Sequence, residues 1–363
     1  MKIYALITDA YGGHGGVSVF NRDLLAAFLD GAAENNVIAV PRVVNRPLEQ
    51  LPERLIYRLE AAKSAAAFLK SVFCDLAEIR KSDVIYCAHI NLTPLAWLLR
   101  LLTARPVLCA LYGIEAWSTP RRSYVAWGAK RMTFYYSISD YTRRRFMAWS
   151  GVPEDRIDLL PNAINLDAYS PGAASEELAQ RLKITGEPVL MTFGRLVSRE
   201  RAKGFDEILD ILPKLIEAHP RIVYIIAGDG EDRERLQDRV RSEGLTEHVG
   251  FTGFVDEADK VDLYRLADLY VMPSRGEGFG FVFLEALACG IPVVASSVDG
   301  SRDAVRDGQL GEMVDPDFPD HLLQAVLRGL EKPKGYVPEG LAYFGHDQFV
   351  RRANAIVRKT LAS

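Results

Sequence analysis

One stretch of the chain, residues 267–290, constrains the fold more than any other. Its apolar start, residues 267–272, predicts a buried strand, and residues 281–288 predict a helix that ends at Gly290. A glycine-rich turn joins the two, with glycine at every second position from 276 to 280. Strand, glycine turn and helix in this order are typical of an α/β sheet. Because the first N–H groups of a helix lack internal partners, the stretch also predicts an anion site.

Two glutamates flank this predicted anion site. Glu277 lies in the turn, and Glu285 lies on the helix eight residues later. A sugar nucleotide carries a diphosphate, which favours N–H dipoles and cations, and sugar hydroxyls, which favour carboxylate acceptors. Glycines allow the backbone to approach such a sugar closely. The alternative is that both glutamates are ordinary solvated acids near a helix start, where negative charge is favoured.

The E-x(7)-E spacing, with Gly278, Phe279 and Gly280 after the first glutamate, resembles the signature of the retaining glycosyltransferases of family 4. The resemblance implies an α/β protein of the glycosyltransferase-B fold, with two Rossmann-like doubly wound domains facing across a cleft. It also implies roles for the motif. Glu277 and the amides of residues 278–280 would hold the donor sugar, and Glu285 would hold the ribose hydroxyls.

The N-terminal residues predict a second phosphate-binding turn. Residues 2–7 read as a buried strand and residues 17–29 as a helix, with a glycine-rich turn between them. The turn fits neither the dinucleotide fingerprint nor the P-loop, and a tight turn without a ligand is the alternative. The resemblance favours Gly15 and Gly16 as backbone donors to the donor phosphates, and it makes His14 an acceptor-side candidate.

Two predicted strands, residues 84–88 and 106–111, end at polar side chains. Strand carboxyl ends line the ligand crevice of a doubly wound sheet, so His89, Tyr112 and Glu115 are further acceptor-side candidates. The chain departs from the family here, because many members carry an H-G-x-E motif and this chain has Tyr112 in place of the histidine. The role of that histidine is therefore not transferred, and His89 is either a partial substitute or a structural residue.

The second half of the chain restarts the α/β alternation. Predicted strands cover residues 189–193, 222–227, 249–252 and 291–296. The resemblance places Arg195 and Lys203 on the donor diphosphate, where Arg195 supplies a bidentate fork and Lys203 a point charge. A solvated surface loop is the alternative for this pair. By the same resemblance Gly228 and Asp229 form a strand-end turn in the donor site, and Val255 lies in the loop that holds the nucleobase.

Residues 160–167 are rich in turn-forming proline, asparagine and aspartate, and they resemble the interdomain linker of the family. We therefore expect an acceptor-side N-terminal domain at residues 1–167 and a domain that binds the nucleotide sugar at residues 168–345. Residues 346–363 are expected to form a helix that crosses back to the N-terminal domain.

Charge is unevenly distributed along the chain. The net charge is −4, which argues against a general nucleic-acid binder, but residues 1–165 carry 20 basic and 15 acidic side chains. Residues 51–80 are strongly helical in composition, with basic and aromatic side chains interleaved. They predict a helix that rests on an anionic membrane surface or, alternatively, an ordinary amphipathic helix on the sheet. Further basic clusters lie at residues 121–122, 130–131 and 143–145. They predict contacts with a lipid diphosphate acceptor or with anionic headgroups, and a solvated face is the alternative.

The sequence predicts neither a metal nor a bound cofactor. The four cysteines lack metal-ligand spacing and read as reduced, buried residues of a cytosolic protein. Asp315 and Asp317 formally match the D-x-D metal motif, but the two prolines around them predict an ordinary turn. The first apolar run is too short for a signal peptide. We expect a cytoplasmic chain with peripheral attachment to the inner face of the membrane.

The resemblance implies a retaining, metal-independent transferase of mannose or glucose from a GDP- or UDP-sugar. The acceptor would be a glycan or an oligosaccharide on polyprenyl diphosphate, as in bacterial exopolysaccharide assembly. One alternative is a catalytically silent partner subunit that keeps the fold and binds a sugar nucleotide. Another is an epimerase of the same fold, which the E-x(7)-E arrangement does not favour.

Overall fold

The structure is a computed structural model that describes residues 1–13, 15–182, 184, 187–197 and 203–363. It divides into two compact units. Unit 1 consists of residues 1–163 and 346–363, and unit 2 consists of residues 164–345. The chain therefore leaves unit 1 after Ala163, within the segment expected to be a linker, and returns to it at His346.

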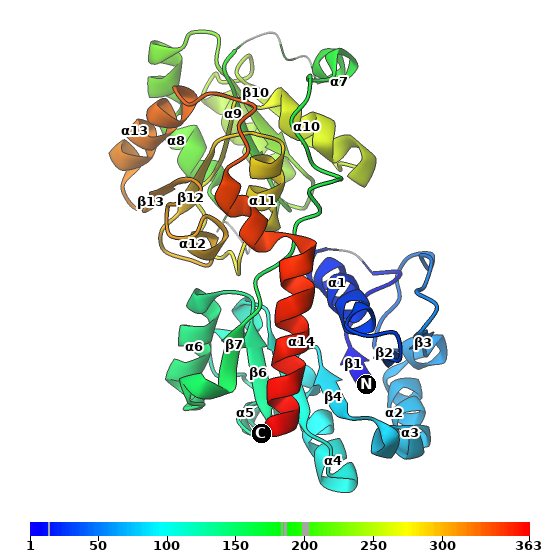
Figure 1. Cartoon of the computed structure of the whole chain (residues 1–363). Helices are drawn as coiled ribbons and strands as arrows, with labels where there is room; N and C mark the ends of the chain where they lie inside the picture. Colours follow the sequence, from blue (N-terminus) through cyan, green and yellow to red (C-terminus); the bar gives the residue numbers. More distant parts are fainter. Residues whose placement is uncertain (14, 183, 185–186, 198–202) are drawn as a thin grey trace. The chain divides into compact units, whose positions relative to one another are not determined.

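Unit 1 is built on a parallel sheet (Figure 1). Its described strands are β1 (Lys2–Ile7), β2 (Asn36–Pro41), β3 (Leu55–Tyr57), β4 (Val84–Cys87), β5 (Val107–Leu111), β6 (Phe134–Ser137) and β7 (Ile157–Leu159). Their order across the sheet is β3-β2-β1-β4-β5-β6-β7. The central strands are almost continuously apolar and buried, as expected for strands covered by helices on both faces.

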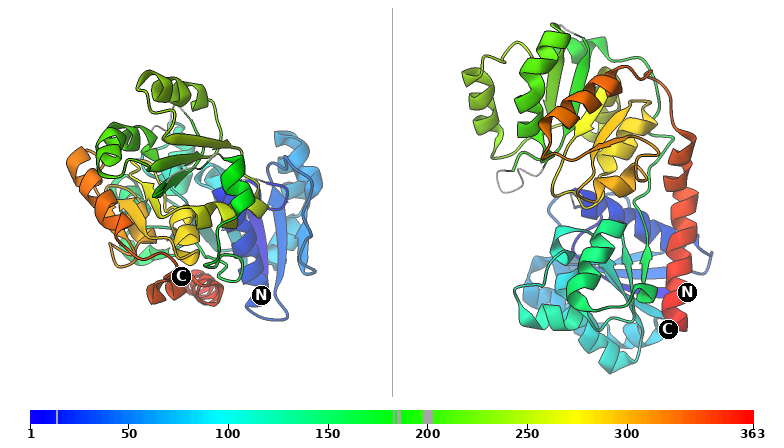
Figure 2. Two further views of the ribbon diagram at one scale, coloured as in Figure 1. Left: turned by 90° about the horizontal axis from the view of Figure 1, so that it is seen from above. Right: turned by 90° about the vertical axis from the view of Figure 1, so that its left-hand side faces the viewer.

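The last helix of the chain completes unit 1. The described α-helices of this unit are α1 (Gly16–Asp30), α2 (Ala65–Cys74), α3 (Leu76–Lys81), α4 (Thr93–Thr103), α5 (Ser123–Ala129), α6 (Asp140–Ser150) and α14 (His346–Ala362). α14 packs beside α1, with the Phe349 and Phe20 rings 5.4 Å apart, and it runs the length of the unit (Figures 1 and 2). The Asn354 amide also donates to the Ala27 carbonyl at 3.0 Å.

Residues 51–80 differ from the expected continuous helix. Leu55–Tyr57 forms edge strand β3, which pairs with β2. The rest forms the 3-10 helix η1 (Leu59–Lys63) followed by α2 and α3. Asp75 separates α2 from α3, because its carboxylate accepts two hydrogen bonds from Arg58 at 3.0 Å and one from the buried Tyr4 hydroxyl at 3.3 Å. Contacts with distant parts of the chain therefore outweigh local helix propensity here.

Unit 2 repeats the architecture with a second parallel sheet. Its described strands are β8 (Val189–Phe193), β9 (Val223–Ala227), β10 (Val249–Gly253), β11 (Leu269–Met272), β12 (Val293–Ser296) and β13 (Glu312–Val314), in the order β10-β9-β8-β11-β12-β13. Its described α-helices are α7 (Glu176–Arg181), α8 (Phe205–Ala218), α9 (Arg233–Ser242), α10 (Lys260–Leu266), α11 (Phe281–Ala288), α12 (Ser301–Ala304) and α13 (Pro319–Leu330). The apolar sides of α8 and α13 pack into the core of this unit.

Each sheet has one point where the strand order reverses. In unit 1 it lies between β1 and β4, and in unit 2 between β8 and β11. Doubly wound sheets bind ligands outside the carboxyl ends of the strands at such points. In unit 2 the two loops concerned carry Arg195 and Lys203 after β8 and Glu277 after β11. Both sets of residues singled out by the sequence therefore flank the reversal point.

Candidate active site

Lys203 and Glu277 form an ion pair at the reversal point of unit 2. The Lys203 ammonium donates to Glu277 Oε2, and the two side chains are only 17% and 18% exposed. Lys203 precedes α8 and Glu277 lies in the glycine turn before α11, so the contact joins loops that are 74 residues apart. A cation and a carboxylate held together in this position can bind an anion and a hydroxyl side by side.

Backbone geometry brings these two loops together. Gly204 has a φ of 83°, which favours glycine, and a Cβ at this position would lie 2.6 Å from the Pro273 carbonyl oxygen directly after β11. Arg195 is exposed in the turn after β8. The segment between Arg195 and Lys203 includes residues 198–202, which lie outside the described part of the chain.

The turn at residues 228–230 packs against the Arg195 turn. A Cβ on Gly228 would lie 2.0 Å from the Gly194 carbonyl oxygen, and one on Gly230 would lie 2.1 Å from the Leu196 carbonyl oxygen. The Asp229 carbonyl accepts from the Leu196 N–H at 3.0 Å. Gly228 and Asp229 thus shape the turn that carries Arg195, and their contact with a donor stays a prediction.

Asp299 and Gly300 hold the glycine turn of residues 276–280, and sequence reasoning had not given them this role. Asp299 Oδ2 accepts from the Glu277 N–H at 2.8 Å and the Ser274 hydroxyl at 2.7 Å, and Oδ1 accepts from the Ser301 N–H at 3.0 Å. Burial raises the pKa of Asp299, and these hydrogen bonds oppose the shift only in part. A Cβ on Gly300 would lie 2.1 Å from the Gly278 carbonyl oxygen.

Glu285 is enclosed by side chains that the motif does not contain. Its Oε1 accepts from the Tyr169 hydroxyl at 2.9 Å and its Oε2 from the Tyr264 hydroxyl at 2.7 Å, while the Lys260 ammonium lies 3.6 Å from Oε1. Burial lowers the pKa of Lys260, but attraction to Glu285 and Glu257 outweighs it, so the net shift is upward. Because a carboxylate offers about four acceptor positions, Glu285 still has capacity for a ribose hydroxyl.

The other predicted donor contacts lie on the same unit. Phe279 is 1% exposed and packs against Phe344, so the whole residue is buried and its contact with a donor stays a prediction. Gly280 has a φ of 95° and precedes α11, whose first N–H groups lack helical partners. Val255 follows β10 and lines a cavity of about 330 Å³ together with Thr252 and Leu263.

The glycine turn of unit 1 also lies at a reversal point. Asp9 Oδ2 accepts from the Ser18 hydroxyl, and a Cβ on Gly13 would lie 2.6 Å from Asp9 Oδ2. Gly15 and Gly16 are exposed at the start of α1. His14 lies outside the described residues. Binding of donor phosphates by Gly15 and Gly16 stays a prediction, which the exposed helix start supports on general grounds.

His89 and Glu115 lie at the carboxyl ends of β4 and β5. His89 Nδ1 accepts from the Asn91 N–H at 3.1 Å, which leaves the neutral ring with its proton on Nε2. Burial lowers the pKa of His89, and the nearby Glu115 and Asp9 oppose the shift only in part. Glu115 Oε1 accepts from the backbone N–H groups of Tyr112 and Gly113 at 2.7 and 3.1 Å, so this carboxylate shapes its own turn.

The Tyr112 hydroxyl points into the core of unit 1. It lies 2.8 Å from the Tyr86 hydroxyl and 3.3 Å from the Tyr136 hydroxyl, and it donates to Asn21 Oδ1 at 2.7 Å. The Asn21 amide in turn donates to the Asp9 carbonyl at 2.8 Å, next to the glycine turn. Tyr112 is 6% exposed, so its side chain belongs to the core of unit 1, and its expected contact with the acceptor stays a prediction.

Comparison with known proteins places this geometry in a family. Residues 15–168 match the family model described as Glycosyltransferase Family 4, and residues 174–338 match the model described as Glycosyl transferases group 1. A GDP-mannose-dependent alpha-(1-6)-phosphatidylinositol monomannoside mannosyltransferase of Mycobacterium tuberculosis is 33% identical over 69% of this chain and 67% of its own length. The chain belongs to glycosyltransferase family 4.

Other family 4 relatives align over shorter segments. A phosphatidyl-myo-inositol mannosyltransferase of Mycobacterium leprae is 39% identical over 56% of this chain and 52% of its own length. A Mycolicibacterium smegmatis relative, carrying the same name as the tuberculosis enzyme, is 34% identical over 56% of this chain and 55% of its own length. The aligned part thus spans about half the length of several curated relatives.

Solved structures confirm the fold of this family 4 chain. Sucrose-phosphate synthase of Thermosynechococcus elongatus superposes with a TM-score of 0.79 at 21% identity, covering 100% of both chains. Anabaena HepE in complex with UDP and glucose gives a TM-score of 0.74 at 21% identity, covering 100% of this chain and 99% of HepE. The predicted class, two Rossmann-like α/β domains of the glycosyltransferase-B type, is therefore correct.

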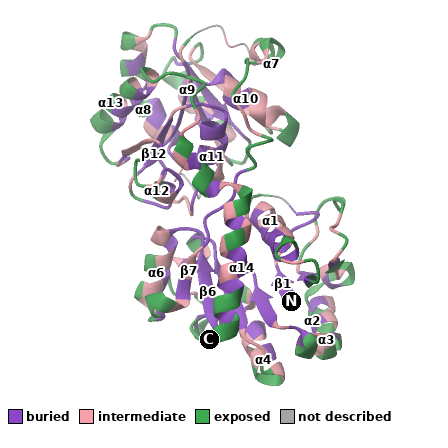
Figure 3. Ribbon diagram, viewed as in Figure 1, coloured by how far each residue is buried: buried purple, intermediate pink, exposed green. Residues whose placement is uncertain are grey.

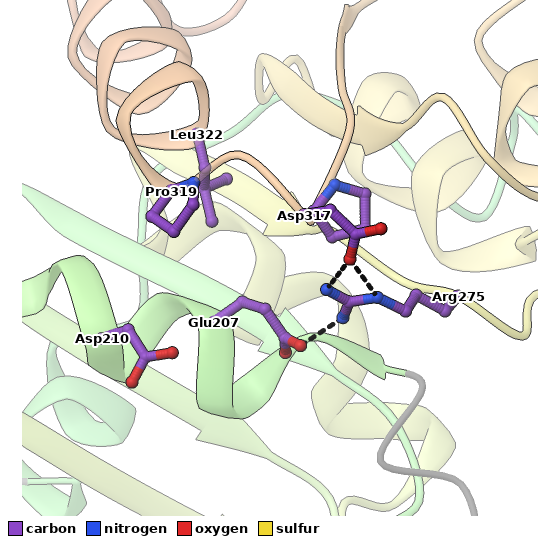
Figure 4. A pocket seen from close by; sticks show the side chains of 7 residues that line it. Glu207, Asp210, Arg275, Asp317, Pro319 and Leu322 are labelled. Atoms are coloured by element: carbon purple, nitrogen blue, oxygen red, sulfur yellow. Dashed lines mark hydrogen bonds and ion pairs between the residues drawn. The ribbon is translucent and has the colours of Figure 1, made fainter.

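The D-x-D segment of this family 4 chain anchors an arginine. Arg275, the residue before the glycine turn, donates to Asp317 Oδ1 at 3.1 and 2.7 Å and pairs with Glu207 on α8 (Figure 4). Asp315 Oδ1 accepts from the Asp317 N–H at 3.0 Å, as in an ordinary turn. Arg275, Asp317 and Glu207 line a cavity of about 230 Å³.

Within the described residues, no group of three or more His, Cys, Asp or Glu side chains is arranged to hold a metal ion. Cys87, Cys109 and Cys289 are buried as expected, but Cys74 at the end of α2 is exposed, so the expectation of burial is wrong for that residue. Over the same residues, no helix is both long enough and apolar enough to cross a bilayer.

Proposed function

We propose that the chain is a retaining hexosyltransferase that moves mannose or glucose from a GDP- or UDP-sugar to a glycan or lipid-linked oligosaccharide. The observation that carries this proposal is the pairing of Lys203 with Glu277 at the reversal point of unit 2, in the same sheet edge as Arg195. The name of the tuberculosis relative supports a GDP-mannose donor, and the names of both mycobacterial relatives support a phosphatidylinositol-based acceptor.

The proposed step breaks the bond between the anomeric carbon and the diphosphate oxygen. The acceptor hydroxyl oxygen forms its new bond to that carbon on the same face, and its proton passes to the departing phosphate oxygen. Arg195, Lys203 and the N–H groups at the start of α11 would stabilise the charge that develops on the phosphate, which is usually the largest catalytic contribution. Glu277 would orient the sugar hydroxyls. Because the two cations can neutralise the diphosphate, the proposal includes no metal.

The acceptor is proposed to be lipid-linked and presented at a membrane. This choice rests on the excess of basic residues in unit 1 and on the lipid substrates in the names of the mycobacterial relatives. A polyprenyl-diphosphate-linked oligosaccharide and a phosphatidylinositol glycolipid share this chemistry. Transfer from a labelled donor to each acceptor class separates the two.

The decisive test removes one cation at a time. Arg195→Ala and Lys203→Ala are each expected to lower kcat by about 10²–10³-fold, because each removes a group that stabilises the leaving phosphate. Arg221→Ala, an exposed arginine ahead of β9, is the matched control and is expected to keep wild-type kcat. Wild-type turnover in both test variants, with unchanged melting temperatures, would refute the proposed role of these cations.

Donor identity is testable by thermal shift. A ligand that binds only the folded chain raises the melting temperature, so GDP-mannose and UDP-glucose should be compared with and without EDTA. We expect one of them to give the larger shift and EDTA to leave it unchanged. A shift that EDTA abolishes would contradict the metal-free proposal.

The substituted Tyr112 favours one alternative, a catalytically silent subunit that binds a sugar nucleotide. Its hydroxyl is committed to Tyr86, Tyr136 and Asn21, so it does not replace the family histidine. A purified chain that shows a donor-induced thermal shift but neither transfers nor hydrolyses any donor would support this alternative.

A further inference from the structure

We propose that the outer faces of α4 and α5 in unit 1 form a docking surface for an anionic phospholipid bilayer. The inference rests on the proposed function insofar as a lipid-linked acceptor requires the enzyme to reach a membrane. The sequence placed such a surface on residues 51–80 or on the basic clusters at 121–122, 130–131 and 143–145, and the structure adds the exposed apolar side chains of α4 and α5 to the first two of these clusters.

α4 exposes large apolar side chains along one side. Leu98, Leu101 and Leu102 are 36%, 60% and 44% exposed, and their spacing of three and four residues puts them on the same face of the helix. The outer end of α4 is coloured as exposed in Figure 3. Insertion of such leucines among acyl chains removes their apolar surface from water, which lowers the free energy of the system.

α5 adds two aromatic side chains. Tyr124 is 55% exposed and Trp127 is 41% exposed, one helical turn apart. Tyrosine and tryptophan are the residues most enriched where proteins meet the headgroup region of a bilayer, because their rings have an apolar body and a polar group.

Direct contacts join the two helices into one surface. The Trp97 ring on α4 packs edge-on against the Trp127 ring with centroids 4.3 Å apart. The Arg131 guanidinium lies 4.1 Å from the centre of the Trp127 ring, and its carbonyl accepts from Arg100 at 2.7 Å. The apolar and basic groups therefore belong to one contiguous patch, which we call the α4–α5 surface.

The positive charge of the α4–α5 surface favours an anionic partner. Residues 93–131 carry six basic side chains and one acidic side chain, and Arg121, Arg122 and Lys130 are exposed. Each basic residue near an anionic membrane contributes about 1 kcal/mol of attraction, which salt screens. This surface combines leucine and aromatic side chains with basic side chains around them. An anionic phospholipid bilayer matches both features, because it offers acyl chains to the leucines as well as negative charge, whereas an acidic protein surface offers only the charge.

The helix α2 offers a comparison on the same unit. It exposes Leu69 and Phe73, which are 44% and 40% exposed, but residues 51–81 carry four acidic side chains beside six basic ones. A double substitution on α2 therefore removes two exposed apolar side chains of the same unit and leaves the α4–α5 surface intact.

The test is vesicle flotation of the full chain, with vesicles of phosphatidylcholine alone and of phosphatidylcholine mixed with phosphatidylglycerol. We expect the wild type to bind the mixed vesicles and to be released by high salt. Leu101→Ser/Leu102→Ser and, separately, Arg121→Gln/Arg122→Gln should each weaken that binding about tenfold or more. Leu69→Ser/Phe73→Ser should bind as the wild type does.

Each other outcome refutes the proposal. Binding that ignores phosphatidylglycerol, absence of binding by the wild type, or loss of binding in the α2 variant alone would show that the α4–α5 surface faces something else. The donor-induced thermal shift is measured on every variant. If the wild type shows no donor-induced thermal shift, the proposed function is contradicted. If a variant keeps the thermal shift but no longer floats with vesicles, the substitution has removed membrane docking and left donor binding intact.

Discussion

Gly300 is the residue at which the packing of the glycine turn is tightest. Its N–H donates to the Glu277 carbonyl at 2.9 Å, and its missing side chain leaves room for the Gly278 carbonyl. Its φ of −69° is one that alanine adopts readily, so any effect of a methyl group here comes from contact and not from backbone strain.

Gly300→Ala is therefore expected to displace the Glu277 turn. We predict a fall in kcat of about tenfold or more, because small misplacements of catalytic groups have large effects on rate. Gly250→Ala in β10, where a Cβ would meet nothing closer than 3.9 Å, is the control and should retain activity. Equal activity of the two variants would mean that the turn tolerates the methyl group.

Asp23 on α1 predicts a pH dependence of stability. Burial raises the pKa of its carboxyl to about 6 from 3.8, against the opposing effects of Arg22 and His346. A carboxyl with a raised folded-state pKa binds more protons when folded. The free energy of unfolding should therefore fall as the pH rises from about 4 to about 6, and the loss should be complete above that range.

Asp23→Asn removes this penalty. Two pKa units correspond to at most about 3 kcal/mol, so the variant should be more stable than the wild type near pH 7 and little changed near pH 4. Urea unfolding at the two pH values measures the difference. Asp155→Asn, an exposed residue of the same unit, is the control. A stability difference that does not vary with pH would refute the assignment.

At the scale of elements, Arg275 connects three segments of unit 2. It lies at the start of the glycine turn, contacts Glu207 in the first turn of α8, and is held by Asp317 ahead of α13 (Figure 4). Because α8 follows directly after Lys203, the arginine connects the two loops that carry the ion pair of the candidate site.

Arg275→Ala should therefore affect activity more than stability. Partly exposed ion pairs contribute about 0–1 kcal/mol each, so the melting temperature should change by only a few degrees. We expect kcat to fall about tenfold, with partial recovery in Arg275→Lys. Arg328→Ala breaks a comparable exposed ion pair on α13 and should leave kcat unchanged. A melting temperature that falls in parallel with activity would indicate a role in folding alone.

At the scale of the whole molecule, unit 2 is one continuous segment, whereas unit 1 is assembled from both ends of the chain. Phe349, Ala353 and Ile356 of α14 are each at most 2% exposed, and α14 contacts β4, β5 and β6 as well as α1. The final 18 residues thus belong to the core of unit 1 and not to a separate tail.

Deletion of residues 346–363 should consequently destabilise unit 1 and spare unit 2. Calorimetry is expected to show loss or strong weakening of one transition and survival of the other. Lys359→Ala, which removes only the exposed contact with Asp158, should preserve both transitions. Loss of both transitions on deletion would show that unit 2 does not fold independently.

The strand, glycine turn and helix at residues 267–290 were predictable because their pattern is local. Apolar runs select buried strands and helices, and glycines mark backbone that side chains would obstruct, so β11 and α11 appeared close to their predicted bounds. The family signature likewise lies within a few adjacent residues. For the same reason β3 was missed, because its three residues become a strand only through pairing with β2.

The surroundings of the signature depended on packing between distant segments. Tyr169 and Tyr264 reach Glu285, Asp299 holds the Glu277 turn, and Tyr112 turns into the core. None of these contacts follows from spacing along the chain, because parallel strands bring together loops that are many residues apart. Residue types and local periodicity therefore specified the elements and the candidate chemistry, while the arrangement of strands in each sheet determined which side chains meet.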